Sequence, residues 1–204
     1  AHLFWYEVGG ASVLGGLVMH TVPTDSRGRL NLEDIDRAIR GKDVHYPQTR
    51  LVCLENTHNR CGGAVLTVDY TDEVSNLAHR RGLKVHLDGA RIFNAAIALG
   101  VPVYALAKDV DSVGLCLSKG LSAPVGSLLC GSVDFVGRAR KFRKMLGGGM
   151  RQAGIIAAAG IVALETMVDR LAEDHANARR LAQGLAGIKG IKLAQDEIPT
   201  NIVM

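Results

Sequence analysis

The chain has 204 residues, a formal net charge of +4 at pH 7 and 22% charged residues. Apolar residues make up 48% of it without its 24 glycines, so with glycine they exceed the ~45–50% usual in soluble domains. This composition excludes a disordered chain, a coiled coil and a collagen, and the mild charge does not argue for nucleic-acid binding. We expect one domain with a sizeable core, buried in part against a partner chain.

The longest stretch without Asp, Glu, Lys or Arg runs from Val8 to Thr24. It holds glycines, hydroxyl residues, a histidine and a proline, and is therefore too polar for a membrane span of ~20 residues. Its glycine pairs, at 9–10 and 15–16, match neither a phosphate loop nor a dinucleotide fingerprint. We interpret them as places where a helix packs closely against its neighbours.

Short apolar runs then alternate with helical patterns. Strands are predicted at 51–55, 84–88, 111–118 and 127–131, and helices at 71–81, 133–145 and 155–185, the last with a break. This spacing predicts βαβ units, a mostly parallel sheet and right-handed crossovers. Ligands of such sheets bind at the carboxyl ends of the strands. The polar segments that end the apolar runs are Glu55-Asn56, Asp88-Gly89-Ala90-Arg91 and Ser118-Lys119-Gly120.

The four cysteines, at 53, 61, 116 and 130, contain no C-x-x-C pair. They therefore indicate neither a zinc ribbon nor a redox dithiol, and we expect no metal. Three of them lie inside apolar runs, as small hydrophobic residues do. A reducing compartment is expected, the cytoplasm first and the mitochondrion as the alternative.

Lys119 and Asp88 are the strongest chemical signal. Lys119 follows a strand of small and apolar residues, where we expect partial desolvation, and a neutral amine there can form a Schiff base with a carbonyl. Asp88 ends the preceding buried strand, and Gly89 and Ala90 are expected to leave room beside it for a flat ring. Pyridoxal phosphate needs both a lysine for its aldehyde and an acid beside its ring nitrogen. The alternatives are a lysine that points into water and an aspartate that only caps a helix.

The segment from Lys141 to Gln152, together with Arg138 and Arg140, is the most basic part of the chain. Three glycines let the backbone approach an anion, and arginine suits a phosphate. The alternatives are a solvated helix face and a nucleic-acid patch. The second alternative is weak because Phe142 is the only aromatic residue in the segment.

Five segments resemble, in order along the chain, those of the low-specificity threonine aldolases. They are His2-Leu3-Phe4-Trp5-Tyr6-Glu7, Glu55-Asn56-Thr57-His58-Asn59, His86-Leu87-Asp88-Gly89-Ala90-Arg91, Leu117-Ser118-Lys119-Gly120-Leu121 with Pro124-Val125-Gly126, and Arg143-Lys144-Met145 to Gln152. The resemblance implies an α/β fold, a three-layer sandwich with a mostly parallel central sheet, as in the type I pyridoxal phosphate enzymes. Residues 1–190 would form the large cofactor-binding domain, incomplete at its amino end, and 191–204 the start of a small domain.

The resemblance also implies a role for each matching residue. Lys119 would carry pyridoxal phosphate as a Schiff base, Asp88 would pair with the pyridine nitrogen, and Arg91 would lie near the ring hydroxyl and the substrate carboxylate. His2 would stack on the ring. His2 or His45 would take the proton of the substrate β-hydroxyl, as a neutral histidine can at pH 7.

Lys144 and Arg151 would reach the cofactor phosphate across a subunit boundary, which implies a homo-oligomer, a dimer of dimers. The implied reaction is the retro-aldol cleavage of L-threonine or L-allo-threonine to glycine and acetaldehyde, within threonine catabolism and glycine formation. The partner is thus a small β-hydroxy-α-amino acid, without nucleic acid or membrane. The alternatives are another type I enzyme, a β-eliminating lyase or an aminotransferase, and an inactive truncated member; the chain by itself is expected to be inactive.

Overall fold

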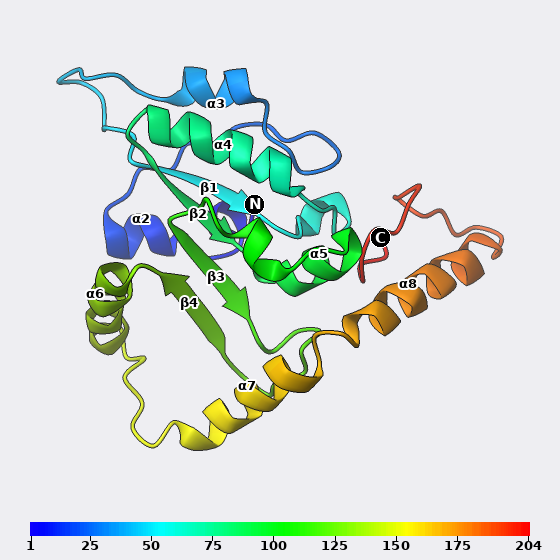
Figure 1. Ribbon diagram of the computed structural model, residues 1–204. Coiled ribbons are helices and arrows are strands. Elements are labelled where there is room, and N and C mark those ends of the chain that lie inside the picture. Colours follow the sequence, from blue (N-terminus) through cyan, green and yellow to red (C-terminus); the bar gives the residue numbers. More distant parts are fainter.

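A four-stranded sheet in the order β1-β2-β3-β4 forms the centre of the computed structural model, which describes residues 1–204 (Figure 1). The strands are β1 (Leu51–Glu55), β2 (Lys84–Asp88), β3 (Ser112–Cys116) and β4 (Ser127–Gly131). β1, β2 and β3 run parallel, and β4 is antiparallel to β3. The connection from β3 to β4 has only ten residues, fewer than a parallel crossover requires. The predicted α/β class with a mostly parallel sheet is confirmed.

Helices flank this sheet (Figure 1). They are α1 (His2–Trp5), α2 (Gly10–Gly15), α3 (Leu32–Ala38), α4 (Val68–Arg80), α5 (Ile92–Leu99), α6 (Val133–Met145), α7 (Gly154–Thr166) and α8 (Leu171–Ala186), with 3-10 turns η1 (Asn59–Cys61) and η2 (Val103–Leu106). Helix α4 begins three residues before the predicted start because the Thr67 side chain accepts a hydrogen bond from Tyr70 N and caps it. The predicted break in 155–185 separates α7 from α8. None of the helices combines the length and apolar character needed to cross a membrane.

The interpretation of the early glycine pairs as close packing is wrong. Gly9 and Gly16 bracket α2 and have φ of 68° and 62°, a left-handed conformation that glycine adopts without steric cost. No neighbouring atom lies within 4 Å of a Cβ built at Gly9, Gly10 or Gly16. These glycines therefore begin and end a short helix, and they do not admit a second element.

The two faces of the sheet differ in chemistry because side chains alternate along each strand. One face presents apolar side chains to α4 and α5 and forms the main core. The buried members of this core are Ile35, Leu54, Leu66, Val74, Leu87, Ile92, Ala95, Ala96, Leu106 and Val113. The other face carries polar side chains, among them Glu55, His86 and Asp88, which the strand register places on one side.

Leu87→Ala is expected to lower the free energy of unfolding by about 2–5 kcal/mol. Leu87 has no exposed surface and lies in the main core, so its truncation leaves a cavity under α4 and α5. Urea denaturation measures the change. The control is Leu181→Ala on α8, where the leucine is 55% exposed; equal losses at the two positions would contradict the assignment of the core.

A buried polar contact joins α5 to α8 next to the turn that carries Lys119. The Nδ2 group of Asn94 lies 3.1 Å from Nε2 of His175, and both residues are buried. A Cβ at Gly120 would lie 2.6 Å from the Leu171 side chain, so the turn after Lys119 packs tightly on the start of α8. Burial, and then the positive charge of Arg179, lower the pKa of His175.

This contact predicts a loss of stability in acid. Because the pKa of His175 is lower in the folded chain than its ordinary value of 6.5, the unfolded state binds the proton more tightly. The free energy of unfolding is therefore expected to fall as the pH drops from about 8 to about 5.

The decline is measured by urea denaturation over this pH range, and it is expected to be smaller in His175→Gln, which does not titrate. Part of it remains, because burial also lowers the pKa of His58 and His86. His20→Gln, at an exposed histidine, serves as the control. A His175→Gln curve that parallels the unmodified one would contradict the prediction.

Candidate active site

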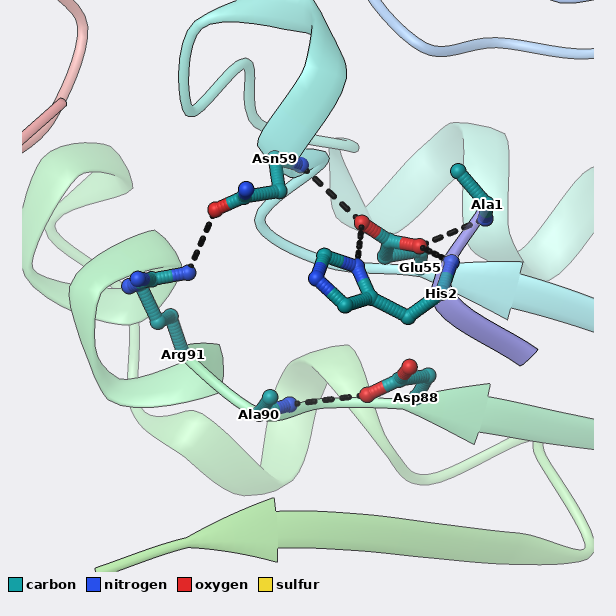
Figure 2. Close-up of polar contacts among 7 residues, drawn as sticks. All are labelled: Ala1, His2, Glu55, Asn59, Asp88, Ala90 and Arg91. Carbon is teal, nitrogen blue, oxygen red and sulfur yellow. Dashed lines mark hydrogen bonds and ion pairs between the residues drawn. The ribbon is translucent and has the colours of Figure 1, made fainter. Parts of the chain in front are cut away.

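The carboxyl ends of β1, β2 and β3 meet at one edge of the sheet. Glu55 pairs with Asp88 in the register, and Asp88 pairs with Gly114, so the two carboxylates lie on the same polar face. Helix α1, which carries His2, lies across this edge, and Arg91 caps the start of α5 beside it (Figure 2). Four polar residues, Glu55, Asp88, His2 and Arg91, thus lie at one edge of the sheet.

Glu55 is the most heavily hydrogen-bonded residue of this edge. It is 6% exposed and accepts from Ala1 N at 2.5 Å, His2 N at 2.7 Å, His2 Nδ1 at 2.9 Å and Asn59 N at 3.0 Å (Figure 2). Burial raises the pKa of Glu55, but the hydrogen bonds from the N–H groups of Ala1, Asn59 and His2 outweigh burial and lower the pKa below its ordinary value. Glu55 is therefore a carboxylate across the physiological pH range.

His2 lies beside Glu55 at this edge. Its Nδ1 atom faces Glu55, and its ring lies on the side of Asp88 in Figure 2. Its side chain is 31% exposed, and the ring of Tyr6 lies 5.0 Å away. One face of an aromatic ring is thus available at the end of β2.

Asp88 is half-buried and forms no ion pair within the chain. Its Oδ1 accepts one hydrogen bond, from Ala90 N at 3.3 Å. The expectation that Gly89 leaves room for a ring is wrong, because a Cβ there would lie 3.1 Å from the carbonyl oxygen of Gly114 and from the Val113 side chain. Because Gly89 has no side chain, the backbone after β2 can pack closely against β3. The chain then continues into α5.

Arg91 is half-buried and only partly satisfied. Its Nη1 donates to Asn59 Oδ1 at 2.7 Å, while its Nε–H is buried and has no acceptor. Burial lowers the pKa of Arg91 against the opposing effects of Cys116, Glu55 and Asp88. The Nε–H of Arg91 lacks an acceptor, and the Asp88 carboxylate lacks a cation. The two groups fit a ligand that offers an acceptor oxygen to Arg91 and a cationic nitrogen to Asp88.

Lys119 follows β3 by three residues, at the same edge as Asp88. The expected partial desolvation is wrong for the chain by itself: Lys119 is exposed, since the turn that carries it lies outside the sheet. Burial opposes ionisation of Cys116, but hydrogen bonds from Ser118 and the charge of Lys119 lower the pKa of its thiol.

The sequence profile of the beta-eliminating lyase family matches residues 1–204. The chain belongs to this family. It is 50% identical over 204 residues to "Low-specificity L-threonine aldolase 1" of Arabidopsis thaliana, covering 99% of this chain and 57% of that protein. It is 45% identical over 196 residues to "Low specificity L-threonine aldolase" of Escherichia coli K12, covering 96% and 58%. The chain thus spans little more than half the length of these relatives, and the resemblance found in its motifs is confirmed.

Solved structures agree on the fold. A putative L-allo-threonine aldolase from Listeria monocytogenes superposes with a TM-score of 0.84 at 23% identity, over 98% of this chain and 54% of that one. Threonine aldolase from Leishmania major gives 0.80 at 23% identity, over 97% and 58%. At these identities the likeness establishes the architecture of the chain and does not establish its substrate.

Three residues expected in the site lie elsewhere in this chain. His45 is 82% exposed in the loop that enters the amino end of β1, where its Nδ1 contacts Asp43 Oδ1 at 2.9 Å. Lys144 and Arg151 are exposed at and beyond the end of α6. Because β4 is antiparallel, α6 begins at the edge opposite Asp88. Roles for these three residues remain predictions that require a second subunit.

Two residues that organise the site were given no role from the sequence alone. Glu55 and Asn59 connect His2 to Arg91 through hydrogen bonds. The position of Glu55 at the end of an apolar strand was the available signal. No local pattern reveals that Asn59, in a 3-10 turn, faces an arginine 32 residues away.

Proposed function

We propose that the complete protein is a pyridoxal phosphate-dependent threonine aldolase that cleaves L-threonine or L-allo-threonine to glycine and acetaldehyde. One observation carries the proposal: the unpaired carboxylate of Asp88 and the acceptor-free Nε–H of Arg91 stand at the same edge of the sheet. The printed names of the relatives from Arabidopsis and Escherichia coli support the substrate.

The residues present fit this cofactor. Asp88 would hold the pyridine nitrogen, Arg91 would donate to the ring hydroxyl or the substrate carboxylate, and His2 would cover one face of the ring. Lys119 would bind the aldehyde. When bound, pyridoxal phosphate supplies an electron-withdrawing ring that accepts the electrons released at the substrate Cα.

Each side chain then has a separate task in the cleavage. The negative charge of Asp88 would favour a protonated ring nitrogen. Arg91 orients the amino acid by its carboxylate. His2 takes the proton of the β-hydroxyl when the Cα–Cβ bond breaks, with His45 of a second subunit as the alternative base.

The proposal includes a homo-oligomer. The site lacks a phosphate-binding group within the chain, and Lys144 and Arg151 of a second copy would supply it. Helices α2, α6 and α7 and the segments next to them expose apolar side chains that a second copy would cover. They are Val13, Leu14, Leu17, Val18, Phe142, Met145, Leu146, Met150, Ile155, Ile161 and Val162.

We further propose that residues 1–190 belong to a large domain and that a small domain starts within 191–204. The closing residues pack on the loop around η1, where Gln195 Nε2 donates to Gly62 O at 2.7 Å and Thr200 Oγ1 to Gly63 O at 2.8 Å. The four free cysteines support a reducing compartment, which we propose to be the cytoplasm, with the mitochondrion as the alternative.

The test is product analysis on the complete gene product with and without pyridoxal phosphate. Glycine and acetaldehyde from threonine, formed only with the cofactor, would support the proposal. The family is named for β-elimination, so the second candidate is a β-eliminating lyase. Pyruvate or another keto acid as the product would favour this second candidate and overturn the first.

A further inference from the structure

The contact between Glu55 and His2 determines the state of the His2 ring. A carboxylate can only accept hydrogen bonds, and burial excludes water from Glu55, which is 6% exposed. The Nδ1 atom of His2 lies 2.9 Å from Glu55 Oε1. The proton of a neutral His2 therefore lies on Nδ1, and Nε2 carries a lone pair.

The lone pair lies on the open side of the ring. Nδ1 is the ring nitrogen turned to Glu55, and the other ring nitrogen points away from it, on the side where Arg91 stands (Figure 2). Asp88 lies below the same ring. The basic atom of His2 thus faces the side of the site on which Arg91 stands.

The Glu55 carboxylate is itself held in place before any ligand binds. The N–H of Asn59 donates to the oxygen that His2 contacts. The Asn59 turn is fixed in turn by Asn56, whose buried side chain bonds both Leu66 O at 3.0 Å and Leu66 N at 3.2 Å. The loop after β1 therefore presents a rigid acceptor to His2.

We propose that Glu55 is a positioning residue that acts through His2. By holding the proton on Nδ1, Glu55 makes Nε2 the atom that accepts the substrate's β-hydroxyl proton, and its negative charge stabilises the imidazolium that results. The O–H bond of the substrate breaks, the Nε2–H bond forms, and the proton later leaves to solvent. This inference rests on the proposed threonine cleavage and assigns the base to His2 and not to His45.

The contrast with His45 supports this assignment. The Nδ1 atom of His45 also contacts a carboxylate, that of Asp43, but the two side chains are 82% and 48% exposed. Water competes for both groups there, so the contact does not hold one tautomer. Asp43 therefore offers a matched control for Glu55.

The first experiment observes the imidazole nitrogens of the complete protein, labelled with 15N and free of pyridoxal phosphate, by long-range 1H–15N NMR. The His2 signals are identified by their loss in His2→Gln. The expected result is a proton on Nδ1 of neutral His2. A proton on Nε2 would overturn the proposal, whether or not the protein cleaves threonine, so the outcome is separate from that of the proposed function.

The second experiment compares variants with the cofactor bound. Glu55→Gln, which can turn an N–H toward the ring, is expected to shift His2 toward the Nε2–H tautomer and to lower kcat about 10–100-fold, with KM nearly unchanged. Glu55→Asp, which keeps the carboxylate, should recover part of kcat, and Asp43→Asn should leave the His2 signals unchanged. A folded Glu55→Gln protein with the original tautomer and kcat would overturn the proposal. If Glu55→Gln does not fold, the His2 tautomer measured by NMR in the unmodified protein still supports or overturns the proposal.

Discussion

Lys119→Ala is expected to lower kcat for threonine cleavage by at least about 100-fold, the lower range for losing a group that transfers protons at a reacting centre. The loss exceeds that of a simple proton donor because the same amine is proposed to bind the cofactor aldehyde. The exposed position of Lys119 at the end of β3 means that its removal leaves the core intact. Activity is measured as acetaldehyde release, and cofactor attachment by absorbance.

Lys84→Ala provides the control for this experiment. Lys84 is also an exposed lysine of the sheet, but it stands at the amino end of β2, where it pairs with Asp111 at 2.7 Å. Its variant is expected to keep full activity and cofactor absorbance. If borohydride still fixes the cofactor to the Lys119→Ala protein, the assignment of the lysine is wrong.

Asp88→Asn is expected to lower kcat by about 10²–10³-fold, the range for removing one electrostatic stabiliser of a reaction. Asparagine has the same shape and keeps an oxygen to accept from Ala90 N, so the fold is retained. The variant lacks the negative charge that holds a proton on the ring nitrogen. Lys119 is unchanged, so the cofactor should still bind while kcat falls.

Asp109→Asn is the matched control, since Asp109 is a 45% exposed carboxylate on the surface near Lys108. It is expected to leave both kcat and cofactor absorbance unchanged. An Asp88→Asn enzyme with nearly full kcat would show that Asp88 serves only to hold the turn before α5, through its hydrogen bond from Ala90 N.

Strand ends were predictable from the chain because they depend on local chemistry. The runs at 51–55, 84–88 and 127–131 are strands with the predicted bounds, and each combines β-branched or apolar residues with a turn signal after it. The positions of Asp88 and Arg91 followed from the rule that parallel strands end at one edge. The helix break between Thr166 and Leu171 was likewise expected from its length.

Other features depend on contacts between distant residues. The role of Gly89 was mistaken because its close neighbour, the carbonyl of Gly114, belongs to another strand. Lys119 is exposed because the turn that carries it lies beyond the end of β3, outside the sheet. His45 is separated from Asp88 because its loop enters the amino end of β1. Lys144 and Arg151 are separated from it because β4 returns the chain to the opposite edge.

The sequence by itself determined the fold class and the edge of the sheet at which Glu55 and Asp88 lie, because periodicity and strand-end polarity are properties of neighbouring residues. Only the tertiary structure decided that Glu55 and Asn59 join His2 to Arg91. Those hydrogen bonds need separate segments to meet within about 3 Å, and no short-range pattern encodes such a meeting. The ordering of the His2 ring is therefore a property of the folded chain and not of the motif that contains it.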